Sequence, residues 1–324
     1  MYNSKIVAFD KFTPETIVTN DNLSRIVETS DEWISSRTGI SKRCILKEGN
    51  TSFLATNVAK KLIEKSNTNI EDIGLIVIAT ITPDYLTPST ACIVQGEIGA
   101  KNAIAFDISA ACSGFVYALS VADKFLKSGL CKKALVIGAE VLSKIVDWND
   151  RGTCVLFGDG AGGIILEASE EENSLIAEDL KADGESWQAI TGGKVPLKNP
   201  FASKEDEESF FMQMNGRDVF NFATKTVPKS IKEVLEKADI GLEDIKYIVP
   251  HQANSRIVEV VAKKLGVSIE KFYLNLQDFG NTSSASIPIA LAEMMEKNLV
   301  KKGDKVILTG FGGGLTWGSM LINI

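Results

Sequence analysis

The chain has 324 residues, of which 44% are hydrophobic and 24% charged, and its net charge at pH 7 is −7. This length suggests two structural units with enough apolar residues to build sizeable cores. The negative charge gives no support to nucleic-acid binding. No apolar run reaches the length of a membrane span, and the first residues lack the pattern of a signal peptide. We therefore expect a cytoplasmic protein that binds neither nucleic acid nor membrane.

Five cysteines and one histidine limit the chemistry of this chain. An odd number of cysteines without CxxC spacing speaks against a disulfide framework and against a structural metal site. The single histidine, His251, excludes any mechanism that needs two histidines.

Alternating strands and helices fill the first half of the chain. A short helix should begin near Trp33, where Ser30 or Asp31 can cap it. Apolar runs predict strands over residues 5–9, 73–79, 103–108 and 134–138. Helical periodicity predicts helices over residues 51–66 and 89–98.

The stretch from Ala103 to Ser128 places a cysteine at a strand-to-helix corner. An apolar run, typical of a buried strand, ends at Ile108; small residues follow, and helical periodicity begins at Phe115. Cys112 therefore lies near a helix N-terminus, where unpaired N–H groups and the helix dipole favour a thiolate. The competing interpretation is a buried cysteine that acts only as a small apolar side chain.

The segment from Ser169 to Ser209 interrupts the alternation, because it carries two acidic runs and two prolines. We interpret its start as the boundary between two domains, residues 1–168 and residues 169–324. The rest of the segment is expected to form mobile excursions over a site. A helix over residues 219–238 then resumes the alternation.

The second half of the chain repeats the order of the first. Similar eight-residue stretches open strands around Ile73 and Ile245. Cys112 lies 112 − 73 = 39 residues past the first, and Asn281 lies 281 − 245 = 36 residues past the second. Both positions head runs of small residues, so duplication is the better explanation. Alternating strands and helices predict an α/β fold with largely parallel sheets.

Duplication predicts that three reactive side chains meet. His251 directly follows a predicted strand, where ligand sites of α/β folds tend to form. In two halves related by a pseudo-twofold axis, Cys112 of one half would face His251 and Asn281 of the other. Taken singly, His251 could be a structural histidine held by hydrogen bonds, and Asn281 an N-cap or turn residue.

Such a site suits acyl transfer. A cysteine thiolate can hold an acyl group as a thioester, while His251 and Asn281 can donate hydrogen bonds to an oxygen on which charge develops. With a malonyl thioester as second substrate, loss of CO2 would generate an enolate that needs no strong base. The glycine-rich turn at residues 310–314 would let backbone N–H groups approach a carbonyl oxygen, although many such turns are only tight connections.

Seven motifs spread along the chain resemble β-ketoacyl-acyl carrier protein synthase III, the initiating condensing enzyme family of type II fatty-acid synthesis. They are DEWI (31–34), RTGI (37–40), AACSGF (110–115), FGDGAG (157–162), HQAN (251–254), GNTS (280–283) and FGGGLTWG (311–318). The family belongs to the thiolase superfamily. The resemblance implies a thiolase-like duplicated αβαβα fold with five layers, a homodimer, and no cofactor besides its substrates.

The resemblance also implies a two-stage reaction. Cys112 would take an acyl group from acyl-CoA and transfer it onto the carbanion formed by decarboxylating malonyl-acyl carrier protein. His251 and Asn281 match the residues that serve decarboxylation and condensation. The backbone N–H groups of Cys112 and Gly313 match the oxyanion hole.

Further matches imply a CoA site. Trp33 and Arg151 match a pair that sandwiches the adenine, for which stacking and cation–π contact give a physical reason. Arg37 would supply charge near the phosphates. The remaining matches are Asn254 on the pantetheine arm, Gly216 as a CoA contact and Phe311 beside the active centre. A core tryptophan and solvated arginines are the ordinary alternative.

The helix after His251 carries a basic face. Arg256, Lys263 and Lys264 are spaced by seven and eight residues and therefore share one side of the helix. Such a face would steer an acidic carrier protein towards the site despite the negative net charge. A solvated charged face is the alternative interpretation.

Two positions depart from the best-known members of the family. Asn221 stands where a docking lysine can occur. Thr87 occupies the position whose side chain caps the acyl pocket across the dimer interface, and its small size leaves room for a longer or branched acyl group.

Two other functions remain open. A related enzyme with the same cysteine, histidine and asparagine could act in secondary metabolism or transfer an acyl group to a small acceptor. A cysteine hydrolase also combines these three residue types, but it leaves the duplication and the CoA-matching residues unexplained.

Overall fold

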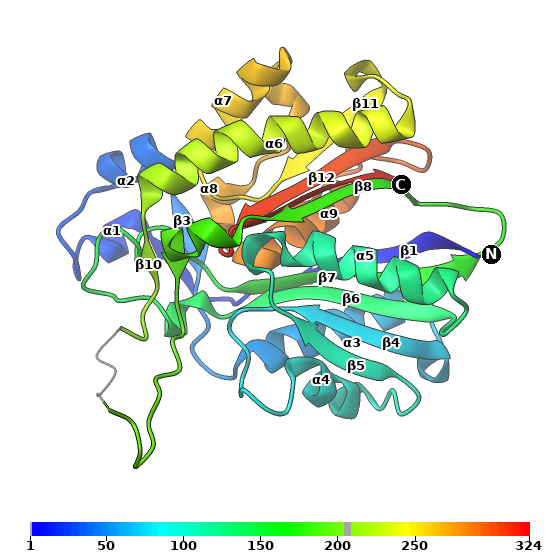
Figure 1. Cartoon of the computed structure of the whole chain (residues 1–324), viewed down its shortest axis with the longest axis horizontal. Helices are drawn as coiled ribbons and strands as arrows, with labels where there is room; N and C mark the ends of the chain where they lie inside the picture. Colours follow the sequence, from blue (N-terminus) through cyan, green and yellow to red (C-terminus); the bar gives the residue numbers. More distant parts are fainter. Residues whose placement is uncertain (1, 204–208) are drawn as a thin grey trace.

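The computed structural model describes residues 2–203 and 209–324. Its elements form five stacked layers of alternating helices and sheets (Figure 1). From bottom to top of the figure, the three helical layers are α3 (Thr51–Ser66) with α4 (Thr90–Ile98), α5 (Gly114–Lys127) with α9 (Ser286–Glu296), and α6 (Gly216–Ala238) with α7 (Ser255–Leu265). Within the described ranges, no helix is both long and apolar enough to cross a membrane.

The first sheet has the strand order β1-β7-β6-β4-β5. Its strands are β1 (Asn3–Phe12), β4 (Ile73–Ala79), β5 (Ile104–Ile108), β6 (Lys133–Glu140) and β7 (Gly160–Ser169). β4 is parallel to β5 and β6, whereas β7 is antiparallel to β1 and β6. β5 lies at the sheet edge with Ile104 48% exposed, so the expectation that this strand is buried is wrong.

The second sheet has the strand order β11-β12-β13-β8. Its strands are β8 (Leu175–Ala182), β11 (Ile245–Pro250), β12 (Lys305–Gly312) and β13 (Thr316–Asn323). Only the β11–β12 pair is parallel. Both sheets are therefore mixed, and the expectation of largely parallel sheets is wrong.

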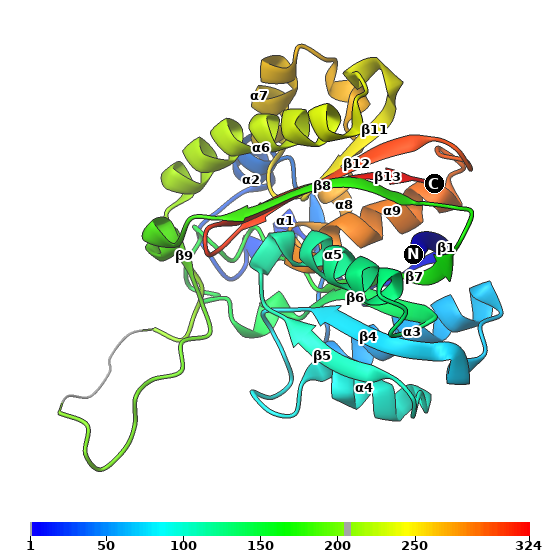
Figure 2. The same cartoon turned by 45° about the vertical axis from the view of Figure 1, so that its right-hand side comes forward.

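The segment after β7 contains a strand that the sequence did not reveal. β8 pairs antiparallel with β13 and completes the second sheet. The chain then forms the short strands β9 (Ile190–Thr191) and β10 (Gln213–Met214), joined by a loop whose described parts lead away from the body (Figure 2). The acidic run at residues 205–208 lies outside the described residues.

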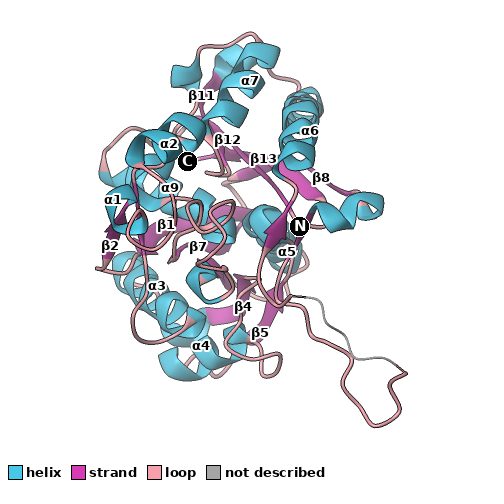
Figure 3. Ribbon diagram, turned by 90° about the vertical axis from the view of Figure 1, so that its left-hand side faces the viewer, coloured by secondary structure: helices cyan, strands magenta, loops and turns pink. Residues whose placement is uncertain are grey.

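Small elements gather at the left of the molecule in Figure 1, the end that faces the viewer in Figure 3. They are β2 (Ile17–Thr19), α1 (Asn20–Leu23), α2 (Asp31–Thr38), β3 (Lys42–Cys44) and α8 (Leu276–Phe279). The side chain of Ser30 accepts a hydrogen bond from the Trp33 N–H and caps α2, as predicted. Ile34, Ile40 and Leu276 share one buried apolar cluster, which joins this end to the second half of the chain.

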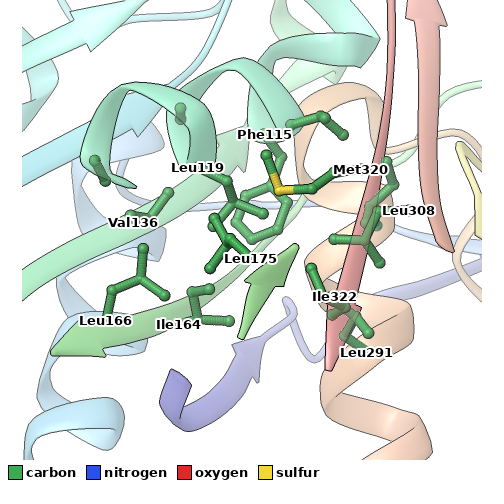
Figure 4. Packing of buried hydrophobic residues seen from close by; sticks show 14 of the residues in the cluster. Phe115, Leu119, Val136, Ile164, Leu166, Leu175, Leu291, Leu308, Met320 and Ile322 are labelled. Atoms are coloured by element: carbon green, nitrogen blue, oxygen red, sulfur yellow. The ribbon is translucent and has the colours of Figure 1, made fainter. Parts of the chain in front are cut away.

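The middle helical layer holds the two sheets together. Phe115 and Leu119 of α5 and Leu291 of α9 pack between Ile164 of the first sheet and Met320 of the second (Figure 4). α5 and α9 are therefore buried on two faces, and the turns that lead into them are fixed from both sides.

The two turns that lead into the helices of the middle layer have the same backbone conformation. A 3₁₀ turn leads into α5 at Ala111, whose φ is +46°, and another leads into α9 at Ser283, whose φ is +48°. Positive φ is uncommon for residues with a side chain. The repeat of this feature indicates that both corners share one origin.

Chain spacing refines the correspondence between the halves. Ser284 follows Ile245 by as many residues as Cys112 follows Ile73 (284 − 245 = 112 − 73 = 39). The structural counterpart of Cys112 is therefore Ser284. Matching Cys112 with Asn281 was wrong by three residues, because runs of small residues do not reveal where the turn begins.

Candidate active site

Cys112 lies in the turn directly before α5 and is half-buried. Two glycines of β12 let this turn approach closely. A Cβ atom at Gly310 would lie 2.8 Å from the Cα atom of Ser113, and one at Gly312 would lie 2.7 Å from the backbone nitrogen of Cys112. Any larger residue at either glycine would push against the backbone of the Cys112 turn.

The surroundings of Cys112 favour the thiol over the thiolate. Burial raises the pKa of Cys112 to about 12, the nearby Ser283 hydroxyl opposes this rise, and a negative charge on Glu140 would add to it. Desolvation of the charged form is the largest of these effects. Against the expectation from the helix N-terminus, burial favours the thiol form of Cys112.

His251 follows β11 and is 1% exposed. Its backbone N–H donates to the carbonyl oxygen of Thr309 at 2.7 Å, and its ring meets the ring of Phe311 edge to face with centroids 5.4 Å apart. Burial lowers the pKa of His251 to about 3, so the imidazole is neutral at physiological pH.

Ser286 orients the His251 ring. Its hydroxyl oxygen lies 2.8 Å from His251 Nδ1 and 2.8 Å from the carbonyl oxygen of Ser283. A hydroxyl has one proton to donate. When that proton goes to Nδ1, the ring proton is on Nε2 and the imidazole can donate from that atom; when it goes to Ser283, Nε2 is an acceptor.

Asn281 is fixed by both its backbone and its side chain. Its N–H donates to the Leu156 carbonyl at 2.8 Å, and its carbonyl accepts from the Gly158 N–H at 3.0 Å. Its Oδ1 accepts from the Ser283 N–H at 2.9 Å. Because the amide oxygen is held in this way, the NH2 group is left to donate to a ligand.

One cavity of about 130 Å³ joins the predicted catalytic residues. Cys112, His251, Asn281, Phe311 and Gly313 all line it. Much of the remaining wall is apolar and includes Ile81, Leu142, Leu156, Ile190, Met212, Met214 and Val219. The sequence did not indicate this wall, because its residues come from separate loops and from the segment expected to be only an excursion.

Three predicted CoA-binding residues lie together at the surface. The guanidinium carbon of Arg37 is 4.7 Å from the centroid of the Trp33 ring, and that of Arg151 is 4.9 Å from it. Arg151 also donates to the Glu28 carbonyl at 3.0 Å. Both guanidinium groups lie against the indole itself, so a base can stack on Trp33 only after an arginine moves off the ring; that arginine can then cover the base or meet its phosphates.

Asn254 connects this surface to the cavity. Its Nδ2 donates to the Arg37 carbonyl at 3.0 Å, and its Oδ1 accepts from the Arg256 N–H at 2.9 Å and caps α7. Asn254 and Gly216, the first residue of α6, both line the cavity. The predicted CoA contacts therefore run from the exposed arginines to the catalytic residues.

The basic residues of α7 are exposed, but two of them reach towards different neighbours. Arg256 Nη2 donates to the Ser36 carbonyl at 2.7 Å, while Lys264 Nζ donates to the Thr224 carbonyl at 2.9 Å. Lys263 is exposed between them in sequence. The helix thus carries positive charge near both α2 and α6.

The other predicted positions lie apart from the cavity. Thr87 sits in an exposed loop and does not line the cavity of its own chain, and Asn221 is exposed on α6. All five cysteines are free. In the part of the chain that the structure describes, no group of three or more His, Cys, Asp or Glu residues could hold a metal ion.

Two family models match the chain. The 3-oxoacyl-acyl-carrier-protein (ACP) synthase III model matches residues 106–184, and the model of its C-terminal part matches residues 235–324. The beta-ketoacyl-acyl-carrier-protein synthase III of Clostridium novyi (strain NT) is 56% identical over 322 residues, which cover 99% of each chain. The chain belongs to the β-ketoacyl-acyl carrier protein synthase III family.

Solved structures of the family share the fold. The 3-oxoacyl-acyl-carrier-protein synthase III of Aquifex aeolicus VF5 matches with a TM-score of 0.93 and 44% identity, covering 99% of this chain and 100% of that one. The priming beta-ketosynthase of the R1128 polyketide biosynthetic pathway matches with a TM-score of 0.92 and 30% identity, covering 99% and 96%. The predicted thiolase-like α/β fold is confirmed.

Proposed function

We propose that this synthase III condenses an acyl group from acyl-CoA with malonyl-acyl carrier protein. The products are CoA, CO2 and 3-oxoacyl-acyl carrier protein, as in the initiating condensation of fatty-acid synthesis. The observation that carries this proposal is the cavity shared by Cys112, His251 and Asn281. Acyl-CoA and acyl carrier protein are its proposed partners.

The first stage acylates Cys112. Its sulfur attacks the carbonyl carbon of the acyl-CoA, the bond between that carbon and the CoA sulfur breaks, and the cysteine proton ends on the CoA thiol. The backbone N–H groups of Cys112 and Gly313 donate to the carbonyl oxygen as it becomes charged.

The second stage uses the malonyl group. The bond to its carboxylate breaks, CO2 leaves, and the electron pair forms an enolate. The Asn281 NH2 group and the His251 Nε2–H donate to the enolate oxygen. The enolate carbon then attacks the acyl carbon on Cys112, a carbon–carbon bond forms, and the cysteine sulfur leaves as a thiolate.

The CoA substrate is proposed to extend from the surface to the cavity. Trp33 and Arg151 would hold the adenine, and Arg37 would lie near the phosphates. Asn254, Gly216 and Phe311 would line the path of the pantetheine arm, which is supported by their place on the cavity wall.

The acidic carrier protein is proposed to dock on α7. Arg256, Lys263 and Lys264 supply its positive charge, and α7 begins at its cap, Asn254, on the cavity wall. A carrier bound there would bring its malonyl group towards His251.

We further propose a cytoplasmic homodimer with no bound cofactor. The exposed edge of β5 offers a strand for pairing with a second copy. Thr87 would then face the partner's acyl pocket. We also propose to divide the chain into residues 1–168 and 169–324, close to the crossing from β7 to β8.

Intact-mass measurement tests the proposal. Incubation with a panel of acyl-CoAs should add one acyl mass per chain, and addition of malonyl-acyl carrier protein should remove it and yield the 3-oxoacyl product. The cavity is close in size to one of about 150 Å³ that holds benzene, so short acyl groups should load best. Efficient loading of long chains alone would instead favour the open pocket inferred from Thr87.

A second candidate is priming of a polyketide pathway, favoured by the 30% identity with the R1128 ketosynthase. It predicts preference for a carrier other than that of fatty-acid synthesis, which competition between two purified carriers would reveal. A cysteine hydrolase would release free acid from Cys112 without any acceptor, whereas the condensing enzyme keeps the thioester.

A further inference from the structure

Ser283 is a polar residue of the cavity wall, and the mechanism described above gives its side chain no role. It is 1% exposed and lines the cavity together with Cys112. Its hydroxyl oxygen is buried and has no hydrogen-bond partner of normal geometry among the described residues. A buried hydroxyl without a partner is costly, so its position calls for a ligand or a reacting atom.

Two neighbouring serine hydroxyls are hydrogen-bonded elsewhere. Ser284 Oγ lies 2.7 Å from the Ala79 carbonyl, and Ser286 Oγ lies 2.8 Å from His251 Nδ1. The other buried hydroxyls without partners belong to Thr29, Thr56 and Thr90, and none of these lines the cavity. Ser283 is therefore the free hydroxyl of the catalytic cavity within the described part of the chain.

Ser283 and Cys112 line the same cavity, and the turns that carry them pack against each other. Burial of Cys112 raises its pKa, and the Ser283 hydroxyl is the main opposing influence. A thiolate is an anion in an apolar cavity, so a donor beside it stabilises the charged form.

We propose that Ser283 is a catalytic residue whose hydroxyl donates a hydrogen bond to the Cys112 sulfur whenever that sulfur carries negative charge. Under the proposed function, on which this inference rests, charge appears there twice. It appears when the thiol loses its proton to attack acyl-CoA, and again when the thioester bond breaks during condensation. Ser283 keeps its own proton throughout, so the balance of both steps is unchanged.

The duplicated turn shows that the hydroxyl can be removed without breaking the fold. Ser283 has φ +48°, and Ala111 at the matching position of the other turn has φ +46°. An alanine is therefore accommodated in this conformation. Ser283→Ala should remove the donor and leave the turn in place.

The test is the rate at which iodoacetamide alkylates Cys112 in the full-length protein, read on the peptide that contains it. At a fixed pH of about 8, this rate follows the thiolate fraction. One hydrogen bond to a charged group predicts that Ser283→Ala lowers the rate by roughly 10- to 100-fold. The rate of acyl loading from acyl-CoA should fall with it, with little change in KM.

Thr56→Ala is the matched control, because it removes another buried hydroxyl without a partner, located on α3 and away from the cavity. It should leave the alkylation rate of Cys112 unchanged. Wild-type alkylation in Ser283→Ala would overturn the inference. Since alkylation uses neither CoA nor carrier, this result stands apart from failure of the proposed condensation, which the acyl-CoA panel reads. If the alanine variant fails to fold, Ser283→Gly, which accepts positive φ freely, replaces it.

Discussion

The Cys112 turn and the Ser284 turn have the same backbone conformation but different surroundings. Cys112 opens onto the cavity, whereas the Ser284 hydroxyl is buried against the first sheet. Ser284 Oγ lies 2.7 Å from the Ala79 carbonyl and 2.8 Å from Glu140 Oε1. After duplication, the Cys112 corner is the one proposed to carry the chemistry, and the Ser284 corner joins the two halves of the fold.

Glu140 is a buried carboxyl group that lies against the Ser284 corner. Its Oε2 accepts from the Thr82 hydroxyl at 2.5 Å and from the Ile81 N–H at 3.1 Å. Ser284 has a single proton for two acceptors, so both contacts are satisfied only when Glu140 carries a proton. Burial raises the pKa of Glu140, which acts in the same direction.

Each corner packs against a glycine from the sheet of the other half: Gly138 of β6 contacts the Ser284 corner, and Gly310 of β12 contacts the Cys112 corner. A Cβ atom at Gly138 of β6 would lie 2.3 Å from the Ser284 carbonyl oxygen, and one at Gly310 of β12 would lie 3.0 Å from the Cys112 carbonyl oxygen. Both glycines are needed for the same close approach. What differs is the side chain that the turn presents and the groups that meet it.

The largest effect is expected from Cys112→Ala. Removing the nucleophile should abolish acyl loading and lower condensation by at least roughly 10⁴-fold, because no thioester can form. Intact mass after incubation with acetyl-CoA measures the loading. Cys92→Ala, which removes an exposed free cysteine, should load normally. Acyl mass on Cys112→Ala would reject the assignment of the nucleophile.

Alanine at the two glycines should have different effects on stability and on acyl loading. Gly138→Ala forces a Cβ against backbone and should lower the free energy of unfolding by about 2 to 3 kcal/mol. Gly310→Ala should cost about 1 to 3 kcal/mol and also reduce acyl loading, because it displaces the Cys112 turn. Urea unfolding and loading rates measure both. Gly184→Ala, where nothing lies within 4 Å, is the control and should change neither.

Glu140→Gln tests the protonation state of Glu140 beside Ser284, and we expect a smaller effect from it. A group whose pKa is raised on folding adds stability below its ordinary pKa, 4.5 here, and that contribution is lost as the pH rises through the folded pKa. Glutamine resembles the protonated acid, so the variant should be more stable than the wild type near pH 7 and equal to it below pH 4.5. Urea unfolding at both pH values tests this. Loss of stability near pH 7 would mean that Glu140 is ionised.

The sequence alone was enough to predict the features that depend on local residue patterns. α3 and β4 have the predicted bounds, because an amphipathic helix leaves a periodic signal and a largely buried strand leaves a continuous apolar run. His251 could be located because it follows a strand directly, and Cys112 because it lies between a strand and a helix. Their meeting in one cavity followed from the duplication.

The rest depended on contacts between distant parts of the chain. β8 pairs with β13, which lies far away in sequence, and its alternating residues resemble those of an exposed loop. The burial that keeps Cys112 a thiol comes from both halves. The small residues around both turns obscured the alignment of Cys112 with Ser284, which the equal chain spacing allows and the backbone angles support.

The most direct test places a second cysteine at the closed corner. In Ser284→Cys, both duplicated turns would carry a thiol, and acetyl-CoA loading followed by peptide mapping would show which one reacts. We expect one acetyl group per chain, on the peptide that contains Cys112. An acetyl group at position 284 would contradict the view that the cavity, and not the turn alone, makes the nucleophile.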